Sequence, residues 1–334
     1  MNAKVTSAPT LLFHCAVSPS IGYGHLSRCL SLADAARSVG YESIFVTVGQ
    51  ETLPADLVTS RGHRVNNELE TEDPLPAMQG VASSHAVKWV VVDSYAVNPT
   101  FLNRSAEIAP LVVMEDQVDR DLTAASMVVC LAPQCEQMTL QTRTDAIVLA
   151  GTRYALVAEE FTRRRPTSLV TREFHPRVER IAVALGATDS TGYMPDVLAA
   201  VGQWAGVEVR VAGEVGYETR ALPDNVTLKG FLSGIDMADL MMWSDLFIAS
   251  ASTLTWELAT LGIPAAFVVT ATNQGRIGRY LEMAGVPVAD SRGQIDALLT
   301  PSRWTSDSRR ELSEKMAGLS DGQGAGRVAR RLQS

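Results

Sequence analysis

Short runs of β-branched and other apolar residues alternate along the chain with longer segments whose apolar positions recur at helical spacing. A parallel sheet covered by helices on both faces produces this alternation, because its strands are buried on both sides. The pattern therefore predicts an α/β protein with two doubly wound halves. The strands are expected at 10–17, 43–48, 87–93, 109–114, 125–130 and 145–151, and then from 181 and at 207–213, 225–230, 245–250 and 264–270.

A polar and basic stretch at residues 158–180 separates the two halves and is the best candidate for a linker. The length of 334 residues also favours two domains, since a single core rarely grows beyond about 250 residues. We expect an N-terminal domain at 1–165, a C-terminal domain at 176–300 and a helical tail at 301–334.

Composition narrows the class of protein. A hydrophobic share of 46% with 20% charged residues describes a folded chain, and the net charge of −8 argues against a protein that holds long nucleic acid. The N-terminal segment fits neither a signal peptide nor a membrane span, so we expect a cytoplasmic protein. The four cysteines lack zinc-site spacing and are expected to be buried, reduced thiols. The oligomeric state stays open.

The stretch "GYGH" follows the first predicted strand and begins a helix expected at about 25–38. Gly22 and Gly24 permit a tight turn and the close approach of a ligand, and the helix start offers unpaired N–H groups. His25 suits a general base, although its position is equally compatible with a helix cap. Arg28 lies on the same helical face and can contact a phosphate or pair with a carboxylate.

Polar side chains also follow two other predicted strands of the first half. Asp93 and Tyr95 end one strand, where alternation places them on one side, and Asp116 follows the next. A tyrosine hydroxyl can orient a water or a sugar hydroxyl, or it can cap a loop. Because parallel strands end at the same edge of a sheet, we expect these side chains near His25.

Hydroxyl and amide side chains follow two strands of the second half. Ser252 and Thr253 are natural N-cap residues for a helix through Glu257, and such a helix start can bind a diphosphate. Glu257 can accept both hydroxyls of a ribose, and Asn273 and Gln274 can contact a sugar or phosphate. Taken singly, Ser252 and Thr253 are better explained as helix caps, and Glu257 as a partner of the helix dipole. Together with Asn273 they predict a nucleotide site.

These segments resemble, in order, the PseG family of hydrolases, which release UDP from a diacetamido-trideoxy sugar in pseudaminic acid biosynthesis. The chain is also similar to SpsG proteins and, more distantly, to MurG-type glycosyltransferases. The similarity runs from about residue 11 to 290. Its landmarks are "GYGHLSRCLSLADA", "VVVDSYAV", "VMEDQVDRD", "GTRYALVAEEF", "VALGATDS", "DMADLMMWSDLFIASASTLTWELATLGIP" and "TNQ".

The resemblance implies a GT-B architecture, in which two Rossmann-like domains face a central cleft and the second binds the nucleotide. It implies that His25 is the catalytic base and that Tyr95 and Asn273 are the other active-site residues. Gly186 stands in "LGATD", where the family has the substrate-binding turn "LGGSD". No metal or cofactor is implied, and we interpret "DRD" at 119–121 as a surface turn.

Three functions follow from this pattern. A nucleoside diphosphate is a good leaving group, so a single base that activates water is sufficient to cleave it from a sugar. The first expectation is therefore an inverting hydrolase of a nucleotide sugar, with UDP as the expected product and water activated by His25. The first alternative is a glycosyltransferase in which His25 deprotonates an acceptor. The second is a non-catalytic nucleotide-sugar binder.

Overall fold

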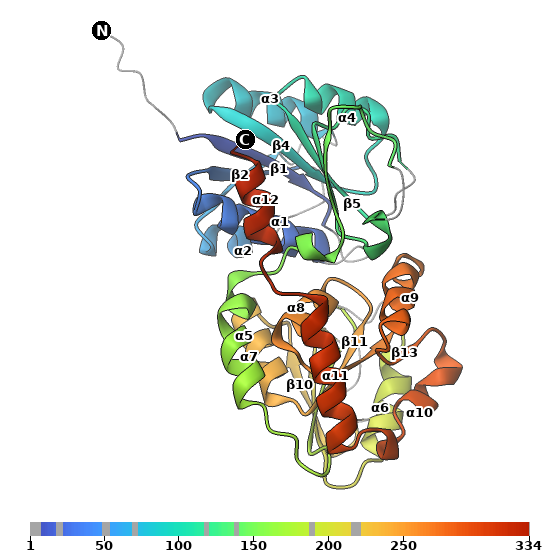
Figure 1. Ribbon diagram of the computed structural model, residues 1–334. Helices are drawn as coiled ribbons and strands as arrows, with labels where there is room; N and C mark the ends of the chain where they lie inside the picture. The colour runs from blue at the N-terminus through green and yellow to red at the C-terminus, as the bar shows by residue number, and fades with distance from the viewer. Residues whose placement is uncertain are drawn as a thin grey trace. The chain divides into compact units, whose positions relative to one another are not determined.

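The contacts within the chain divide it into two units (Figure 1), and each unit is described by itself below. Unit 1 consists of Met1–Leu156 and Gln323–Ser334, and unit 2 of Val157–Gly322. This division differs from the sequence-based boundaries, because the expected tail is split between the two units. The computed structural model describes residues 8–17, 23–48, 54–68, 73–116, 120–136, 140–186, 191–214 and 222–333.

Unit 1 is built on a parallel sheet, which has seven strands among the described residues, in the order β3-β2-β1-β4-β5-β6-β7. The strand order reverses between β1 and β4, and ligands of such sheets bind at the carboxyl ends of the strands at this point. The sequence pattern missed β3, because its residues "RVNNE" form no apolar run. The strands are β1 (Thr10–Cys15), β2 (Glu42–Val48), β3 (Arg64–Glu68), β4 (Val87–Asp93), β5 (Leu111–Glu115), β6 (Met127–Cys130) and β7 (Ile147–Ala150).

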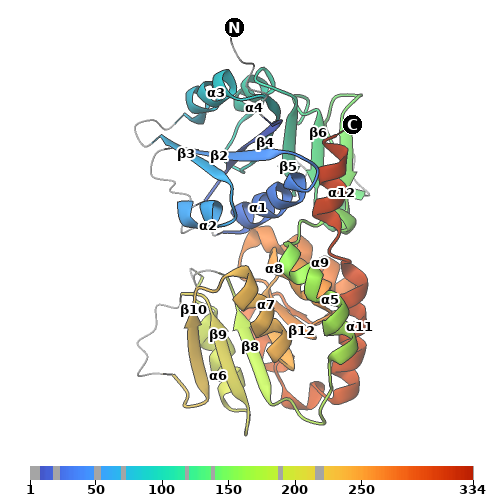
Figure 2. The same cartoon turned by 90° about the vertical axis from the view of Figure 1, so that its left-hand side faces the viewer.

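Helices cover both faces of this sheet (Figure 2). Neighbouring residues of β1 point to opposite faces, so Phe13 joins one core with Val328 of α12, while Leu12 joins another with Leu102 of α4. The sheet is therefore buried on both sides, as its apolar strands predict. The helices of unit 1 are α1 (Gly24–Arg37), α2 (Ala55–Ser60), α3 (Pro74–Ser84), α4 (Pro99–Ala106) and α12 (Gly324–Arg331), with 3₁₀ turns η1 (Pro133–Glu136) and η2 (Thr152–Tyr154).

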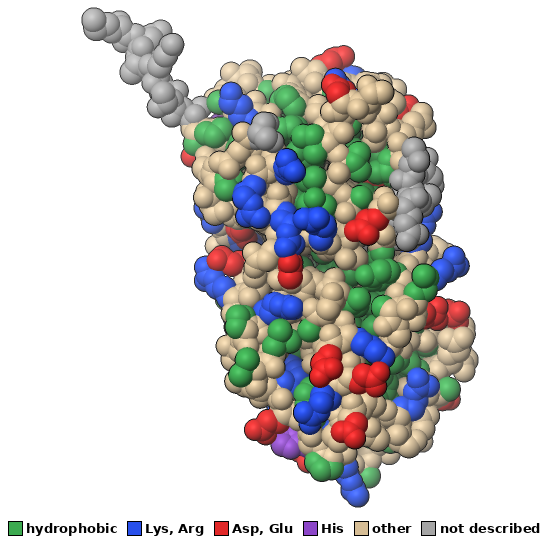
Figure 3. Space-filling view, viewed as in Figure 1, with side chains coloured by type: hydrophobic (Ala, Val, Ile, Leu, Met, Phe, Trp, Pro, Cys, Tyr) green, Lys and Arg blue, Asp and Glu red, His purple; other side chains and the backbone are tan. Residues whose placement is uncertain are grey.

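Helix α12 returns from the far end of the sequence to complete unit 1. The carbonyl of Leu332, just after it, accepts hydrogen bonds from Tyr41 Oη at 2.6 Å and Trp89 Nε1 at 2.9 Å. Lys and Arg side chains gather over this helix on the face shown in Figure 3. Arg330 and Arg331 occupy its last turn, where positive charge is favoured by the helix dipole. The helix thus buries its apolar side and exposes its basic one.

Unit 2 is built on a second parallel sheet, with six strands among its described residues, in the order β10-β9-β8-β11-β12-β13. Its order also reverses, between β8 and β11. The strands are β8 (Arg180–Ala184), β9 (Glu208–Ala212), β10 (Val226–Gly230), β11 (Leu246–Ser250), β12 (Ala265–Val268) and β13 (Val288–Ala289).

The expected linker at 158–180 is mostly helical, which corrects the sequence interpretation. Its helix α5 buries Phe161 and Ser168 and contacts α7 and α8, while Arg163 is exposed. Arg165 is half-buried and donates hydrogen bonds to backbone carbonyls of unit 2. A helix with so few apolar positions resembles a polar loop in sequence. The helices of unit 2 are α5 (Glu159–Thr171), α6 (Met194–Gly202), α7 (Gly234–Trp243), α8 (Leu254–Leu261), α9 (Gly275–Met283), α10 (Ile295–Leu298) and α11 (Ser306–Leu319), with 3₁₀ turns η4 (Thr272–Gln274), η5 (Arg292–Gln294) and η6 (Pro301–Arg303).

The expectation of four reduced cysteines is wrong for one pair. Cys130 at the end of β6 and Cys135 in η1 form a disulfide, because the turn between them brings their Cα atoms to 5.9 Å. Cys15 and Cys29 are free and buried, as expected. Among the helices of the described ranges, none has the length and apolar character needed to cross a membrane.

Candidate active site

A histidine and an aspartate meet at the carboxyl end of the unit 1 sheet. His25 lies in the first turn of α1, only 6% exposed, and its Nδ1 is 2.5 Å from Oδ1 of Asp93, the last residue of β4. Arg28 Nη2 is 3.1 Å from the same Nδ1, but a nitrogen that donates to Asp93 cannot also accept from Arg28. The shorter contact to a carboxylate indicates that Nδ1 carries the proton. Nε2 then keeps its lone pair, which is the arrangement of a general base.

Arg28 joins the two carboxylates of this region. Its Nε and Nη2 donate to the two oxygens of Asp93, both at 2.5 Å, and its Nη1 donates to Asp116 Oδ2 at 2.8 Å. Burial alone would raise the pKa of Asp93, but the charge of Arg28 and the hydrogen bonds that Asp93 accepts from Arg28 and His25 outweigh it and hold this pKa well below its ordinary value. Burial would lower the pKa of Arg28, which the two carboxylates raise instead. Asp93 is therefore a carboxylate and Arg28 a cation at neutral pH.

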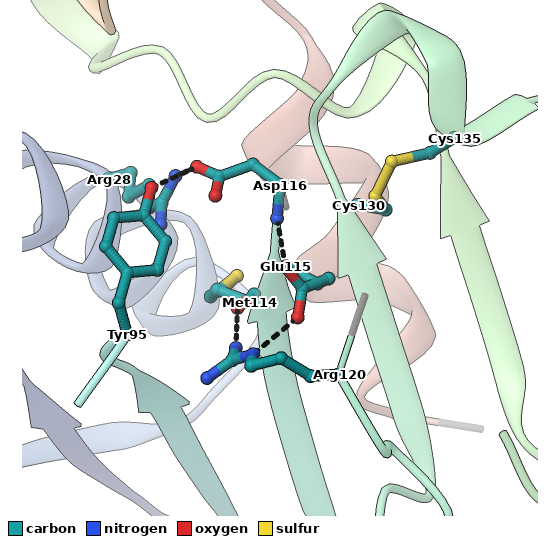
Figure 4. Close-up of a disulfide and its surroundings, with 8 residues drawn as sticks. All are labelled: Arg28, Tyr95, Met114, Glu115, Asp116, Arg120, Cys130 and Cys135. Carbon is teal, nitrogen blue, oxygen red and sulfur yellow. Dashed lines mark hydrogen bonds and ion pairs between the residues drawn. A yellow bond between two sulfur atoms is a disulfide. The ribbon is translucent and has the colours of Figure 1, made fainter. Parts of the chain in front are cut away.

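Tyr95 lies against the imidazole and binds the second carboxylate. Its ring meets that of His25 edge-on, with centroids 4.6 Å apart, and its hydroxyl donates to Asp116 Oδ2 at 2.8 Å. Burial and the charge of Asp116 raise the pKa of Tyr95, so the hydroxyl keeps its proton. Figure 4 shows Arg28 and Tyr95 converging on Asp116. Asp116 Oδ1 is buried and has no hydrogen-bond partner within the described part of the chain.

The structure thus brings together the candidate residues of the first half that the sequence placed at strand ends. His25 does not act as a helix cap through its ring, because Tyr23 occupies the N-cap position of α1. Gly24 is the first residue of α1, and Gly22 lies outside the described residues. The cluster consists of His25, Arg28, Asp93, Tyr95 and Asp116.

A pocket of about 570 Å³ lies at the same edge of the unit 1 sheet, beside the first turns of α3 and α4. Its lining includes Phe101, Asn98 and His14, a histidine of β1 that is only 6% exposed. Burial lowers the pKa of His14, so its imidazole is neutral at neutral pH. Ser94 also lines the pocket and directly follows Asp93 in the chain. The pocket and the cluster therefore adjoin the same strand end.

The predicted hydroxyl residues of unit 2 lie at the start of α8, just after β11. Ser252 Oγ is 3.0 Å from Ser250 Oγ, and Thr253 occupies the N-cap position. The expected capping is not observed, because Thr253 has helical dihedral angles and no side-chain cap bond. Glu257 follows in the same helix with 8% of its surface exposed.

The remaining predicted residues of unit 2 follow the strands on either side of β11. Gly186 comes after β8 with a φ of 130°, which favours glycine. Asn273 and Gln274 lie in η4 after β12, where Asn273 is exposed and Gln274 Oε1 accepts from the backbone N–H of Thr270 at 2.9 Å. Because β8, β11 and β12 are neighbours in the sheet, these loops share one edge of unit 2.

The sequence interpretation overlooked an ion pair behind the cluster. Arg120 belongs to the segment interpreted as a surface turn, yet only 15% of its side chain is exposed and its Nε donates to Glu115 at 2.7 Å. Of the two acidic residues in that segment, Asp121 accepts bonds from Thr123, and Asp119 lies outside the described residues. The sequence does contain a signal for this ion pair, which is an acidic residue at the end of an apolar strand followed five residues later by an arginine.

Comparison with known proteins shows the fold. No family model matches the chain, and no curated protein sequence matches it significantly. MurG of Acinetobacter baumannii is 14% identical to this chain over 97% of this chain and 99% of its own, with a TM-score of 0.65. The spinosyn rhamnosyltransferase SpnG complexed with spinosyn aglycone is 16% identical over 97% of this chain and 100% of its own, with a TM-score of 0.62. UDP-GlcNAc 2-epimerase from Neisseria meningitidis bound to UDP-GlcNAc is 10% identical over 97% of this chain and 99% of its own, with a TM-score of 0.61. The chain therefore has the GT-B fold, with two Rossmann-like parallel-sheet units.

Proposed function

We propose that the protein transfers a sugar from a nucleotide donor to an acceptor hydroxyl, with His25 as the general base. The observation that carries this proposal is the contact between His25 Nδ1 and Asp93, which leaves Nε2 available to take a proton. Similar structures include a rhamnosyltransferase complexed with an aglycone and an epimerase bound to UDP-GlcNAc, which supports a nucleotide sugar as the donor.

The proposed reaction uses the residues in the following roles. Nε2 of His25 takes the acceptor proton while the acceptor oxygen attacks the anomeric carbon, and Asp93 stabilises the imidazolium that forms. The bond between that carbon and the diphosphate breaks, and its electron pair leaves with the nucleotide. Tyr95 keeps the imidazole in place, and Asp116 Oδ1, buried without a partner in the described part of the chain, accepts a substrate hydroxyl.

In this proposal, unit 2 binds the donor nucleotide. The start of α8 with Ser252 and Thr253 stabilises the departing diphosphate, because backbone N–H groups and the helix dipole favour negative charge there. Glu257 accepts the ribose hydroxyls, and Asn273 contacts the sugar. Gly186 and Gln274 complete the nucleotide site.

Hydrolysis is the second candidate, and the order of the sequence landmarks shared with the PseG family favours it. Water would then take the place of the acceptor hydroxyl with the same base. The similar solved structures favour transfer instead, because they include glycosyltransferases, one of them complexed with an aglycone.

A panel assay separates these functions. UDP-, GDP- and CMP-sugars are incubated with the protein, with and without alkyl and aryl glycosides as acceptors, and the free nucleotide is measured. Transfer predicts release that rises several-fold with one of the acceptors, together with a glycosylated product. Equal release without any acceptor would show hydrolysis. Binding of a donor without release in any mixture would contradict both.

Replacing Glu257 by glutamine tests the nucleotide site. A hydrogen bond to a charged group contributes about 1.5–3 kcal/mol, so we expect the KM for the donor to rise about 10- to 100-fold. The value of kcat should change little, because the ribose is remote from the reacting carbon. Glu282→Gln, in the exposed surface of α9, is the matched control. An unchanged KM in Glu257→Gln would remove this residue from the site.

A further inference from the structure

We infer that Glu115 and Arg120 form a positioning pair, which holds His25 and the residues of its cluster in place relative to one another. The inference rests on the proposed function for the role of His25, and its geometry stands on unit 1 alone. Neither residue belongs to the cluster around His25. Both act on the backbone that carries the cluster.

The pairing of β4 with β5 stops short of the site. It runs from Val90 with Leu111 to Val92 with Val113 and ends there in the described part of the chain. On its other side β5 stays paired with β6 as far as Glu115. The ladder between β4 and β5 therefore does not fix the segments beyond it, which carry Tyr95 and Asp116.

One guanidinium bridges the two strand ends at this point, and Figure 4 shows its contacts on the β5 side, with Met114 and Glu115. Arg120 Nη1 donates to the carbonyl oxygen of Ser94 at 2.7 Å, and Nη2 donates to that of Met114 at 3.3 Å. Nε of the same side chain donates to Glu115 Oε2 at 2.7 Å. A planar guanidinium presents these donors at fixed angles, so it sets the separation of the strand ends in a way that the single ammonium of a lysine cannot.

Glu115 completes the connection on the β5 side. Its side chain is fully buried, and its Oε1 accepts the backbone N–H of Asp116 at 2.8 Å. Ser94 and Glu115 are thus held directly before Tyr95 and Asp116, which bind each other through the tyrosine hydroxyl. Asp116 in turn binds Arg28, which binds Asp93, the partner of His25 Nδ1.

A shift of the two strand ends would therefore also change the position of the His25 imidazole. If Asp116 and Tyr95 shift, Arg28 loses one of its two carboxylates and the ring of His25 loses the edge of Tyr95 that confines it. A misplacement of about 1 Å can cost about 10²-fold in rate even when the altered residue is remote from the chemistry. The pair is therefore expected to affect kcat rather than donor binding.

The test compares Arg120→Met and Arg120→Lys with the wild type. We expect Arg120→Met to lower kcat about 10- to 100-fold with little change in the donor KM. Arg120→Lys should recover only part of the loss, because lysine cannot reach all three oxygens. Arg143→Met is the matched control, since Arg143 pairs with Asp145 on the exposed surface of the same unit.

The second measurement needs no turnover. In protein with ¹⁵N-labelled histidine, the Nδ1–H signal of His25 reports the contact with Asp93, and Arg120→Met is expected to shift or broaden it while the fold is retained. An unchanged His25 signal in folded Arg120→Met would overturn the inference, as would an unchanged kcat. A shifted signal in a protein that turns over no nucleotide sugar would support the positioning role and contradict the proposed function.

Discussion

Replacement of His25 by alanine is expected to lower turnover of the nucleotide sugar by about 10²- to 10⁴-fold, the usual contribution of a general base. Donor binding should stay within a few-fold of the wild type, because the proposed nucleotide contacts come from unit 2. Steady-state kinetics and calorimetric titration of the nucleotide measure the two quantities separately. Added imidazole should restore part of the rate by taking the place of the missing ring.

The chain offers a matched control for this variant. His63 also binds an aspartate, with its Nε2 2.9 Å from Asp34 Oδ1, but Asp34 lies in the last turns of α1, away from the carboxyl edge of the sheet. His63→Ala should keep kcat within about twofold when both proteins are compared below their unfolding transitions. Wild-type turnover in His25→Ala would exclude His25 as the base.

Replacement of Asp93 by asparagine should have the largest effect on stability. Asp93 is fully buried and pairs with Arg28 and His25, so its loss leaves the buried charge of Arg28 with Asp116 as its one acidic partner among the residues that the structure describes. Breaking a buried ion pair from one side costs about 3–5 kcal/mol. We therefore expect urea unfolding of Asp93→Asn at neutral pH to show a free energy of unfolding lower by about this amount.

An exposed ion pair provides the comparison. Asp145 is paired with Arg143 and both side chains are about half exposed or more, so Asp145→Asn should cost less than about 1 kcal/mol. Asp93→Asn should also abolish most of the turnover, because an amide does not hold the Nδ1 proton as the carboxylate does. Equal stabilities of the two variants would show that the buried pair contributes little.

The lowered pKa of Asp93 gives the pH dependence of this stability. The folded protein binds fewer protons at Asp93 than the unfolded chain, in which aspartates titrate at about pH 3.9. Its contribution is therefore fully present above that pH and is lost as the pH falls toward the folded pKa. Between about pH 4 and pH 2 the free energy of unfolding should fall more steeply in the wild type than in Asp93→Asn. Parallel curves would contradict this linkage.

Local patterns in the sequence were sufficient to predict most strands and the edge where the site forms. Strand β4 matches the expected range 87–93, within which the residues from Trp89 to Val92 form an uninterrupted apolar run. Strand β3 and helix α5 were missed because their polar residues give no such signal. Spacing along α1 placed Arg28 beside His25 but left open which carboxylate it binds. The structure shows that it binds both Asp93 and Asp116.

Contacts between distant segments account for what the sequence did not predict. The disulfide between Cys130 and Cys135 depends on the turn that η1 makes after β6, and cysteine spacing alone does not specify that turn. The roles of Glu115 and Arg120 depend on where the ladder between β4 and β5 ends, which is a property of strand pairing.

The return of α12 to unit 1 has a consequence for the order of events during synthesis. Unit 2 is continuous in sequence and can fold as soon as its residues have left the ribosome. Unit 1 lacks Ala325, Val328 and Ala329 of its core until α12 has also emerged. The half of the protein that is made first is thus completed last. Until then the surface of α1 that α12 covers stays open to chaperones and to aggregation.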